Sequence, residues 1–247
     1  MRTGVLFLAI LLFHLSVSTA FAARPLLTED TETVEKGQFE IELGFDFVRD
    51  DNRDQYYIPS TQLKYGLRAN AEIGVTMGYI FKDLHGNGRV DGFSDLFAYA
   101  KYRFWDEGSS YPSLALKLSA IFPTASREKD LGSGEVDYGL AAIFSKSFGN
   151  LALHFESLYL FIGEEGRTDI LGLGLAGEYE FTKTLMGVAE VRHFQNFNSD
   201  RKDDPFSCLL GFKVKWGKTI WDGGVNIGLN SAAIDYGLTV GVTIPFP

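Results

Sequence analysis

The sequence predicts an all-β fold, a transmembrane antiparallel up-and-down β-barrel of about 12 strands. Three observations predict it: apolar and polar side chains alternate along most of the chain, short turns alternate with longer polar loops, and aromatic residues gather near the ends of the alternating segments. Successive side chains of a strand point to opposite faces, so each segment has one apolar face and one polar face. The last segment places on its apolar face Tyr236, Leu238, Val240, Val242, Ile244 and Phe246.

Residues 1–22 read as a signal peptide. Arg2 provides a positive start, residues 5–15 form an apolar run, and Ala20-Phe21-Ala22 matches the small-x-small cleavage pattern. We expect cleavage after Ala22 or Ala23 and export to the outer membrane of a bacterium. An uncleaved anchor is the alternative, but the run is short for a helix that must span a bilayer with roughly 20 residues.

Residues 23–37 form a polar, extended leader between the signal peptide and the barrel, which we place at residues 38–247. Two positions are open for this leader: it threads into the lumen as a partial plug, or it hangs in the periplasm. Inside the lumen its charged side chains could pair with those of the wall: Arg24, Glu29, Asp30, Glu32 and Glu35.

The first half of the barrel contains five alternating segments. The opening strand sets large apolar side chains against Glu40, Glu42 and Asp46, a pattern that a soluble domain would need a strongly charged exposed sheet face to explain. A tight hairpin at 69–71 joins the second and third strands, and a glycine-rich loop at 85–92 precedes the fourth. The predicted segments are 39–47, 57–68, 72–82, 94–104 and 113–123.

The second half of the barrel continues the same pattern through seven further segments, 136–145, 151–161, 170–181, 185–196, 207–216, 221–229 and 235–246. Long polar links follow the odd-numbered strands and mostly shorter turns follow the even ones, so the turns are expected in the periplasm. Aromatic residues at the strand ends would form the two interfacial girdles. A large soluble β-sandwich is the competing fold, with the apolar face as its core.

Composition excludes several function classes. The chain has a net charge of −9, and an acidic protein is a poor partner for nucleic acid, whose phosphates require clustered Lys and Arg. The lone cysteine, Cys208, excludes an internal disulfide and a cysteine-based metal cage. Nucleic acid is thus not an expected partner. The predicted outer-membrane barrel indicates three others: outer-membrane lipid, the barrel assembly machinery and a small-molecule solute.

The polar faces of the strands would line the lumen of the barrel. An isolated buried charge is costly, so charges of both signs in a narrow lumen must pair or remain wet. They are either ion-pair ladders that hold a nearly closed barrel together or the walls of a polar solute path. The candidates are Glu40, Glu42, Asp46, Lys64, Arg68, Asp95, Phe97, Tyr99, Lys101, Arg103, Lys117, Asp137, His154, Glu156, Glu178, Glu190, Arg192, Lys213 and Lys215.

Motifs that would indicate catalysis or a cofactor are weak. The glycines of 172–177 match G-x-G-x-x-G, but strand alternation runs through them where a dinucleotide site needs a helix to begin. Outer-membrane lipid hydrolases use a His-x-Ser pair, whereas the residues two positions after His85, His154 and His193 are Asn87, Glu156 and Gln195. We expect no enzyme, cofactor or metal site, and we interpret His154 with Glu156 as a hydrogen-bonded pair in the lumen.

Several stretches resemble outer-membrane proteins assigned to the MetA pathway of phenol degradation. They are residues 24–31, 34–40, 92–96, 101–104, 123–124, 131–134 and 137–139. The resemblance implies a porin-like outer-membrane channel or transporter for small solutes, including aromatic or hydrophobic compounds, and it supplies no binding residue. Phe97 and Tyr99 would suit an aromatic solute or pack against a plug. The alternative function is a closed structural or surface-interaction barrel without transport.

Overall fold

The computed structural model describes residues 24–49, 55–84, 88–197 and 204–246. The predicted signal peptide and most of the predicted charged loop at 198–204 lie outside these ranges. The described residues form thirteen β-strands. No helix among them is long and apolar enough to cross a membrane.

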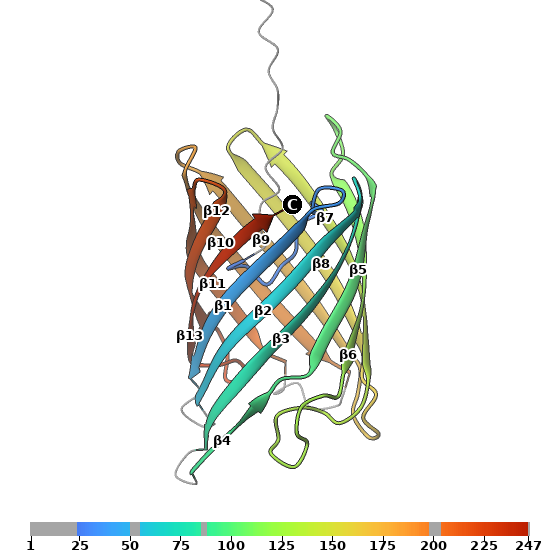
Figure 1. Cartoon of the computed structure of the whole chain (residues 1–247), viewed down its shortest axis with the longest axis vertical. Helices are drawn as coiled ribbons and strands as arrows, with labels where there is room; N and C mark the ends of the chain where they lie inside the picture. Colours follow the sequence, from blue (N-terminus) through green and yellow to red (C-terminus); the bar gives the residue numbers. More distant parts are fainter. Residues whose placement is uncertain (1–23, 50–54, 85–87, 198–203, 247) are drawn as a thin grey trace, which may run out of the picture.

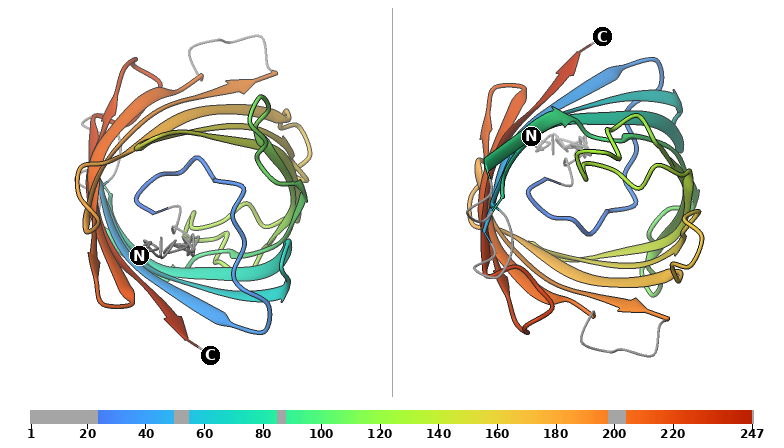
Figure 2. Two further views of the ribbon diagram at one scale, coloured as in Figure 1. Left: turned by 90° about the horizontal axis from the view of Figure 1, so that it is seen from above. Right: turned by 90° about the horizontal axis from the view of Figure 1, so that it is seen from below.

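The strands wind in chain order around a closed antiparallel barrel (Figures 1 and 2). The first and last strands pair in register from Phe39 opposite Phe246 to Arg49 opposite Tyr236, and β2–β3 pairing completes the circle. The strands are β1 (Phe39–Arg49), β2 (Gln55–Arg68), β3 (Ala71–Leu84), β4 (Gly88–Phe93), β5 (Leu96–Trp105), β6 (Ser113–Phe122), β7 (Asp137–Phe148), β8 (Leu151–Phe161), β9 (Ile170–Glu180), β10 (Leu185–Asn196), β11 (Phe206–Trp216), β12 (Thr219–Gly228) and β13 (Tyr236–Phe246).

The barrel has twelve strand positions, because β4 and β5 share one of them. Both pair with β3: β4 lies along Tyr79–Leu84 and β5 along Ala71–Thr76. The predicted glycine-rich loop at 85–92 is therefore wrong for residues 88–92, which continue the wall beyond the interruption at Ser94 and Asp95. The predicted closed barrel of about 12 strands is confirmed.

The two faces of the wall have the polarity that a bilayer requires. Large apolar side chains are exposed on the outer face, where Leu118 is 61%, Leu210 62% and Val240 55% accessible. The inner face buries charged side chains, and Lys213 is 0% and Glu156 2% accessible. Soluble proteins show the opposite arrangement, whereas a transmembrane barrel places its apolar band toward lipid.

Short turns gather at one end of the barrel, the turn end, and longer links gather at the other, the loop end. Gly149 and Gly217 adopt positive φ of 64° in two-residue turns at the turn end, a conformation that glycine adopts without strain. Exposed aromatic side chains ring both ends, with Phe104, Phe181, Trp216 and Trp221 at the turn end and Phe81, Phe122 and Phe161 at the loop end.

Candidate solute path

The leader, residues 24–37, lies inside the barrel (Figure 2). It runs from the middle of the lumen toward the turn end. There the Gly37 amide donates a hydrogen bond of 2.7 Å to the carbonyl of Gly66, just before β1 begins. Leu26 packs in the lumen against an apolar patch formed by Ala176, Val188 and Leu209. Of the two positions that the sequence allowed, the described part of the leader takes the one inside the lumen.

Carboxylates of the wall hold the backbone of the leader. The amides of Leu27 and Thr28 both donate to Glu190 Oε2 at 2.8 Å. The Val34 amide donates to Glu72 at 2.7 Å, and the amide of Glu29 donates to Glu156 at 3.0 Å. Hydrogen bonds to charged acceptors are stronger than those to neutral ones. These carboxylates therefore supply partners for backbone amides of the leader, which are not paired in a helix or sheet.

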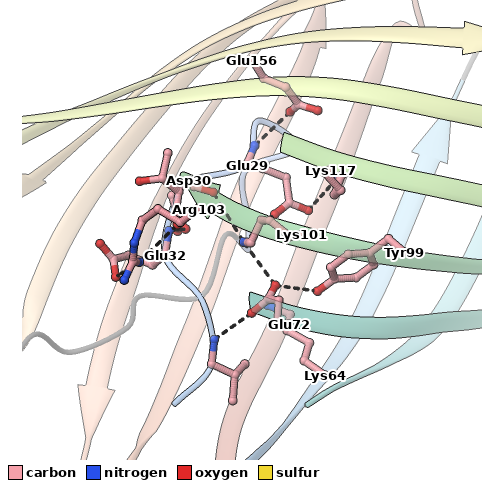
Figure 3. A network of polar contacts seen from close by, with 12 residues as sticks. Glu29, Asp30, Glu32, Lys64, Glu72, Tyr99, Lys101, Arg103, Lys117 and Glu156 are labelled. Carbon is pink, nitrogen blue, oxygen red and sulfur yellow. Dashed lines mark hydrogen bonds and ion pairs between the residues drawn. The ribbon is translucent and has the colours of Figure 1, made fainter. Parts of the chain in front are cut away.

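Ammonium and guanidinium groups of the wall hold the acidic side chains of the leader (Figure 3). Glu29 is 2.8 Å from Lys117 Nζ and 3.4 Å from Lys101 Nζ, while Glu32 is 3.1 Å from Arg103. Burial alone would raise the pKa of Glu29, but the coulombic attraction of Lys117 and Lys101 outweighs it and holds that pKa well below its usual range. Glu29 is therefore ionised at neutral pH.

Asp30 and Glu32 behave differently from Glu29. Burial raises the pKa of Asp30, against the partial opposition of Lys101. Burial also raises the pKa of Glu32, and the neighbouring Asp30 charge adds to this effect. The lumen thus shifts the pKa of Glu29 downward and the pKa values of Asp30 and Glu32 upward.

Arg24 lies in a recess made by two glycines that face each other across the β1–β13 seam. A Cβ atom at Gly44 would lie 2.3 Å from Arg24 Nη1, and one at Gly241 would lie 2.4 Å from Nε, so only glycine leaves room for the guanidinium. Arg24 Nη2 donates to the Thr239 hydroxyl at 2.8 Å and the Val240 carbonyl at 2.9 Å. Asp222 Oδ1 is 3.6 Å away.

The wall also pairs its own charges. Lys213 Nζ donates to Glu178 at 2.6 Å, and Lys101 lies 3.2 Å from Glu72. Further pairs join Lys64 to Glu40 and Glu42, and Arg192 to Glu156, and the Tyr99 hydroxyl donates to Glu72. Such pairs give many of the buried charges of the wall an opposite charge, which lowers the cost of their burial.

The structure brings most of the candidate residues together in the lumen. Those whose side chains are buried on the inner face are Glu40, Glu42, Lys64, Tyr99, Lys101, Lys117, Asp137, His154, Glu156, Glu178, Glu190, Arg192 and Lys213. Half-buried candidates are Asp46, Phe97, Arg103, Lys215 and Asp95, of which Asp95 accepts a hydrogen bond from the Ala125 amide at the loop end.

Arg68 is the candidate that the structure removes from the lumen. It is exposed at the turn end, because a register shift between Gly66 and Arg68 interrupts the alternation of β2. A bulge places two residues opposite one, so every side chain beyond it changes face. The strict alternation assumed from the sequence does not hold at this position.

His154 has partners that differ from the predicted one. Its Nδ1 lies 2.8 Å from the Ser145 hydroxyl, and its Nε2 lies 3.9 Å from Glu178, which is held more closely by Lys213. The predicted His154–Glu156 pair is therefore replaced by a cross-strand pair. The Ser145 hydroxyl also accepts a hydrogen bond of 3.1 Å from the Thr31 amide, so the Ser145–His154 pair holds the leader.

Sequence reasoning missed Ser145 and Lys82. Ser145 and His154 stand opposite each other because the turn at Gly149–Asn150 is equidistant from both, a symmetry that any two-residue hairpin imposes. Lys82 continues the polar face of β3 and reaches Asp130 in the loop before β7, at 2.6 Å. Hairpin symmetry and strand parity are the signals that could have found them.

Three cavities open along the lumen, and the leader borders two of them. Arg24 to Leu27 and Glu29 line a cavity of about 420 Å³. Asp30 and Glu32 line another of about 690 Å³ that extends to the turns of the turn end. A third, of about 1020 Å³, lies among residues of the loop end. Among the described residues no group of three or more His, Cys, Asp or Glu side chains could hold a metal ion.

A family model and several solved structures resemble the chain. The model described as "Putative MetA-pathway of phenol degradation" matches residues 22–246. An outer membrane channel from Pseudomonas putida F1 has 14% identity, with a TM-score of 0.65 over 88% of this chain and 98% of that one.

Two other solved barrels share the fold at lower identity. The NanC porin has 9% identity and a TM-score of 0.59, over 83% of this chain and 98% of its own. The CymD monoaromatic hydrocarbon channel has 9% identity and a TM-score of 0.53, over 85% and 89%. A search of curated proteins gave no match. The solved structures show that the fold is that of outer-membrane barrels.

Proposed function

Because this chain belongs to the family described by the MetA pathway of phenol degradation, we propose that it is a channel for small solutes, including aromatic or hydrophobic compounds, across the bacterial outer membrane. The observation that carries the proposal is the closed barrel with a charged, cavity-bearing interior and an apolar outer face. Cavities on both sides of the internal leader leave space for a solute, which a purely structural barrel does not require.

The location follows the same reasoning. The apolar band and its aromatic rims suit outer-membrane lipid, and the turn end belongs in the periplasm, as is usual for such barrels. Export by the predicted signal peptide and insertion by the barrel assembly machinery would deliver the protein there. The three solved barrels described above are channels and a porin, which supports a role in solute passage.

The leader is proposed to act as the constriction of the path. Its residues 24–27 and 29 border one cavity and its residues 30 and 32 border the next, so solute moving between them must pass it. Most of its contacts are hydrogen bonds and ion pairs, which can be exchanged for water, beside the apolar packing of Leu26. We therefore expect passage to require local displacement of the leader.

The test is reconstitution of the full-length protein, after removal of the signal peptide, into planar bilayers and liposomes. We expect discrete conductance steps and faster uptake of phenol than in protein-free liposomes. Protein that has been heat-unfolded, identified by its changed mobility on a detergent gel, serves as the control. The same conductance in both samples would contradict the proposal.

The alternative of a closed structural barrel is favoured by one observation, the filling of the mid-lumen by the leader and paired charges. It predicts no conductance and no uptake, even when the leader is weakened by Arg24→Ala. Conductance in Arg24→Ala but none in the natural protein would instead indicate a channel that is closed at rest.

A further inference from the structure

We propose that Lys117 and Lys101, beside the rings of Phe97 and Tyr99, bind an aromatic carboxylate. The Glu29 side chain, next to both lysines in Figure 3, occupies the place of that carboxylate. The proposal rests on the proposed channel function and specifies the class of solute. It also assigns to the leader the part of an internal competitor for the solute site.

Lys117 is the residue that requires an anion. Glu29, at 2.8 Å, is its one ion-pair partner among the described residues, and its side chain is only 9% exposed. Lys101 keeps Glu72 at 3.2 Å when Glu29 leaves. A buried ammonium without a counter-charge is costly, so displacement of Glu29 favours entry of another anion.

The surroundings of Lys117 favour an anion that carries a ring. Its Nζ is 5.8 Å from the ring centroid of Phe97 and 5.6 Å from that of Tyr99, and the two ring centroids are 6.0 Å apart. Aromatic pairs prefer offset or tilted contacts at such separations, and a solute ring beside its carboxylate could add to this group. Phe97 is half-buried on the inner face, so part of its ring remains accessible.

The shape of the Glu29 contact defines the anionic group. Its two carboxylate oxygens are divided between two ammonium groups, Oε1 with Lys117 and Oε2 with Lys101. This is the geometry of a carboxylate monoanion shared by two cations. The same side chain borders the cavity of about 420 Å³, which offers room for a small aromatic acid next to the site.

Other solute classes fit this site less well. A neutral phenol supplies no charge for Lys117. An aromatic cation would meet two ammonium groups, and the acidic recess around Asp222 is already occupied by Arg24. Charge and ring together therefore favour benzoate-like molecules over phenol-like or benzylamine-like ones.

The experiment compares full-length natural protein, Glu29→Ala, Lys117→Gln and the double variant, with benzoate as the probe. Lys146→Gln is the control, because Lys146 is a lysine near the turn end that pairs with Glu107 and lies outside the site. Blocking of single-channel current by benzoate is measured beside phenol, benzylammonium and cyclohexanecarboxylate. We expect Glu29→Ala to bind benzoate at least tenfold more tightly than the natural protein. Lys117→Gln should abolish the gain in the double variant, and Lys146→Gln should change nothing.

A second measurement does not depend on conductance. Benzoate should raise the temperature at which Glu29→Ala loses its folded gel mobility, and should leave the double variant unmoved. Equal effects of benzoate, phenol and benzylammonium, or unchanged benzoate binding without Lys117, would overturn the proposed site. Equal binding of cyclohexanecarboxylate would overturn its aromatic part. Benzoate binding without any conductance would refute the channel function and leave the site standing.

Discussion

Gly44→Ala should release Arg24, the first described residue of the leader, from its recess at the β1–β13 seam. The new Cβ would stand 2.3 Å from Arg24 Nη1, 2.6 Å from its Cζ and 3.0 Å from its Nη2, so the three nearest atoms all belong to this guanidinium. The guanidinium must therefore leave the recess while the β1 backbone stays. Arg24 then loses its hydrogen bonds to Thr239 and Val240, of 2.8 and 2.9 Å.

The magnitude follows from those two bonds. Hydrogen bonds from a charged donor contribute about 1.5–3 kcal/mol each, and water in the lumen replaces part of that, so docking of the leader should weaken by about 2 kcal/mol. This corresponds to roughly a 30-fold change in the ratio of docked to undocked leader. Hydrogen exchange of the amides of residues 27–34 should accelerate by a similar factor, because exchange there requires undocking.

A double-mutant comparison isolates the cause. In protein that already carries Arg24→Ala, adding Gly44→Ala should accelerate exchange no further, since the displaced group is absent. Equal acceleration by Gly44→Ala with and without Arg24 would refute the role of the recess. Unchanged exchange in the single variant would show that Arg24 does not hold the leader.

Three further predictions test the leader, the wall and the outer face. The pKa of Glu29 lies below its ordinary value of 4.5, so its contribution to docking of the leader is present above pH 4.5 and is lost as the pH falls further. The rate of amide exchange in the leader should therefore change less on acidification in Glu29→Gln than in the natural protein. Asp30, whose pKa is raised, acts in the opposite sense in both proteins. Lys213→Met strands the Glu178 carboxylate in the wall and should cost about 3–5 kcal/mol in urea unfolding, most of it recovered by adding Glu178→Gln. Leu210→Arg places a charge on the lipid face and should cost about 2–4 kcal/mol of folding stability in vesicles near mid-bilayer, whereas little change would contradict the outward orientation of that side chain.

Alternation along the chain was sufficient to predict the barrel. Lipid-facing and lumen-facing residues must alternate on every strand, so the polarity of each residue predicts the face of the wall on which its side chain lies. Leu210 on the outer face and Lys213 on the inner face are examples. The closing pair could also be predicted, because an up-and-down barrel must join its first strand to its last. Two predictions were wrong where the two-residue alternation is interrupted: the inward direction of Arg68 after the bulge in β2, and the loop at residues 88–92, which is the strand β4.

The partners inside the lumen were harder to predict. Parity gives the direction of a side chain but not its height in the barrel, and height depends on the stagger between strands. His154 was therefore assigned to Glu156, its neighbour on the same strand, when Ser145 on the next strand is its contact. The path of the leader has no periodicity at all, since it is fixed by side-chain contacts to distant strands.

The contacts of the leader also impose an order on assembly. Arg24 rests against β13, which ends one residue before the end of the chain, while Val34 is bound by Glu72 of β3 and Leu27 by Glu190 of β10. Arg24 is separated from Val240 by 216 residues, so the recess that receives it does not exist until the final seam has formed. Residues 24–34 are thus among the last parts of the described chain to reach their place. Protein trapped before closure should be cleaved by a protease within residues 24–34 more readily than the closed barrel.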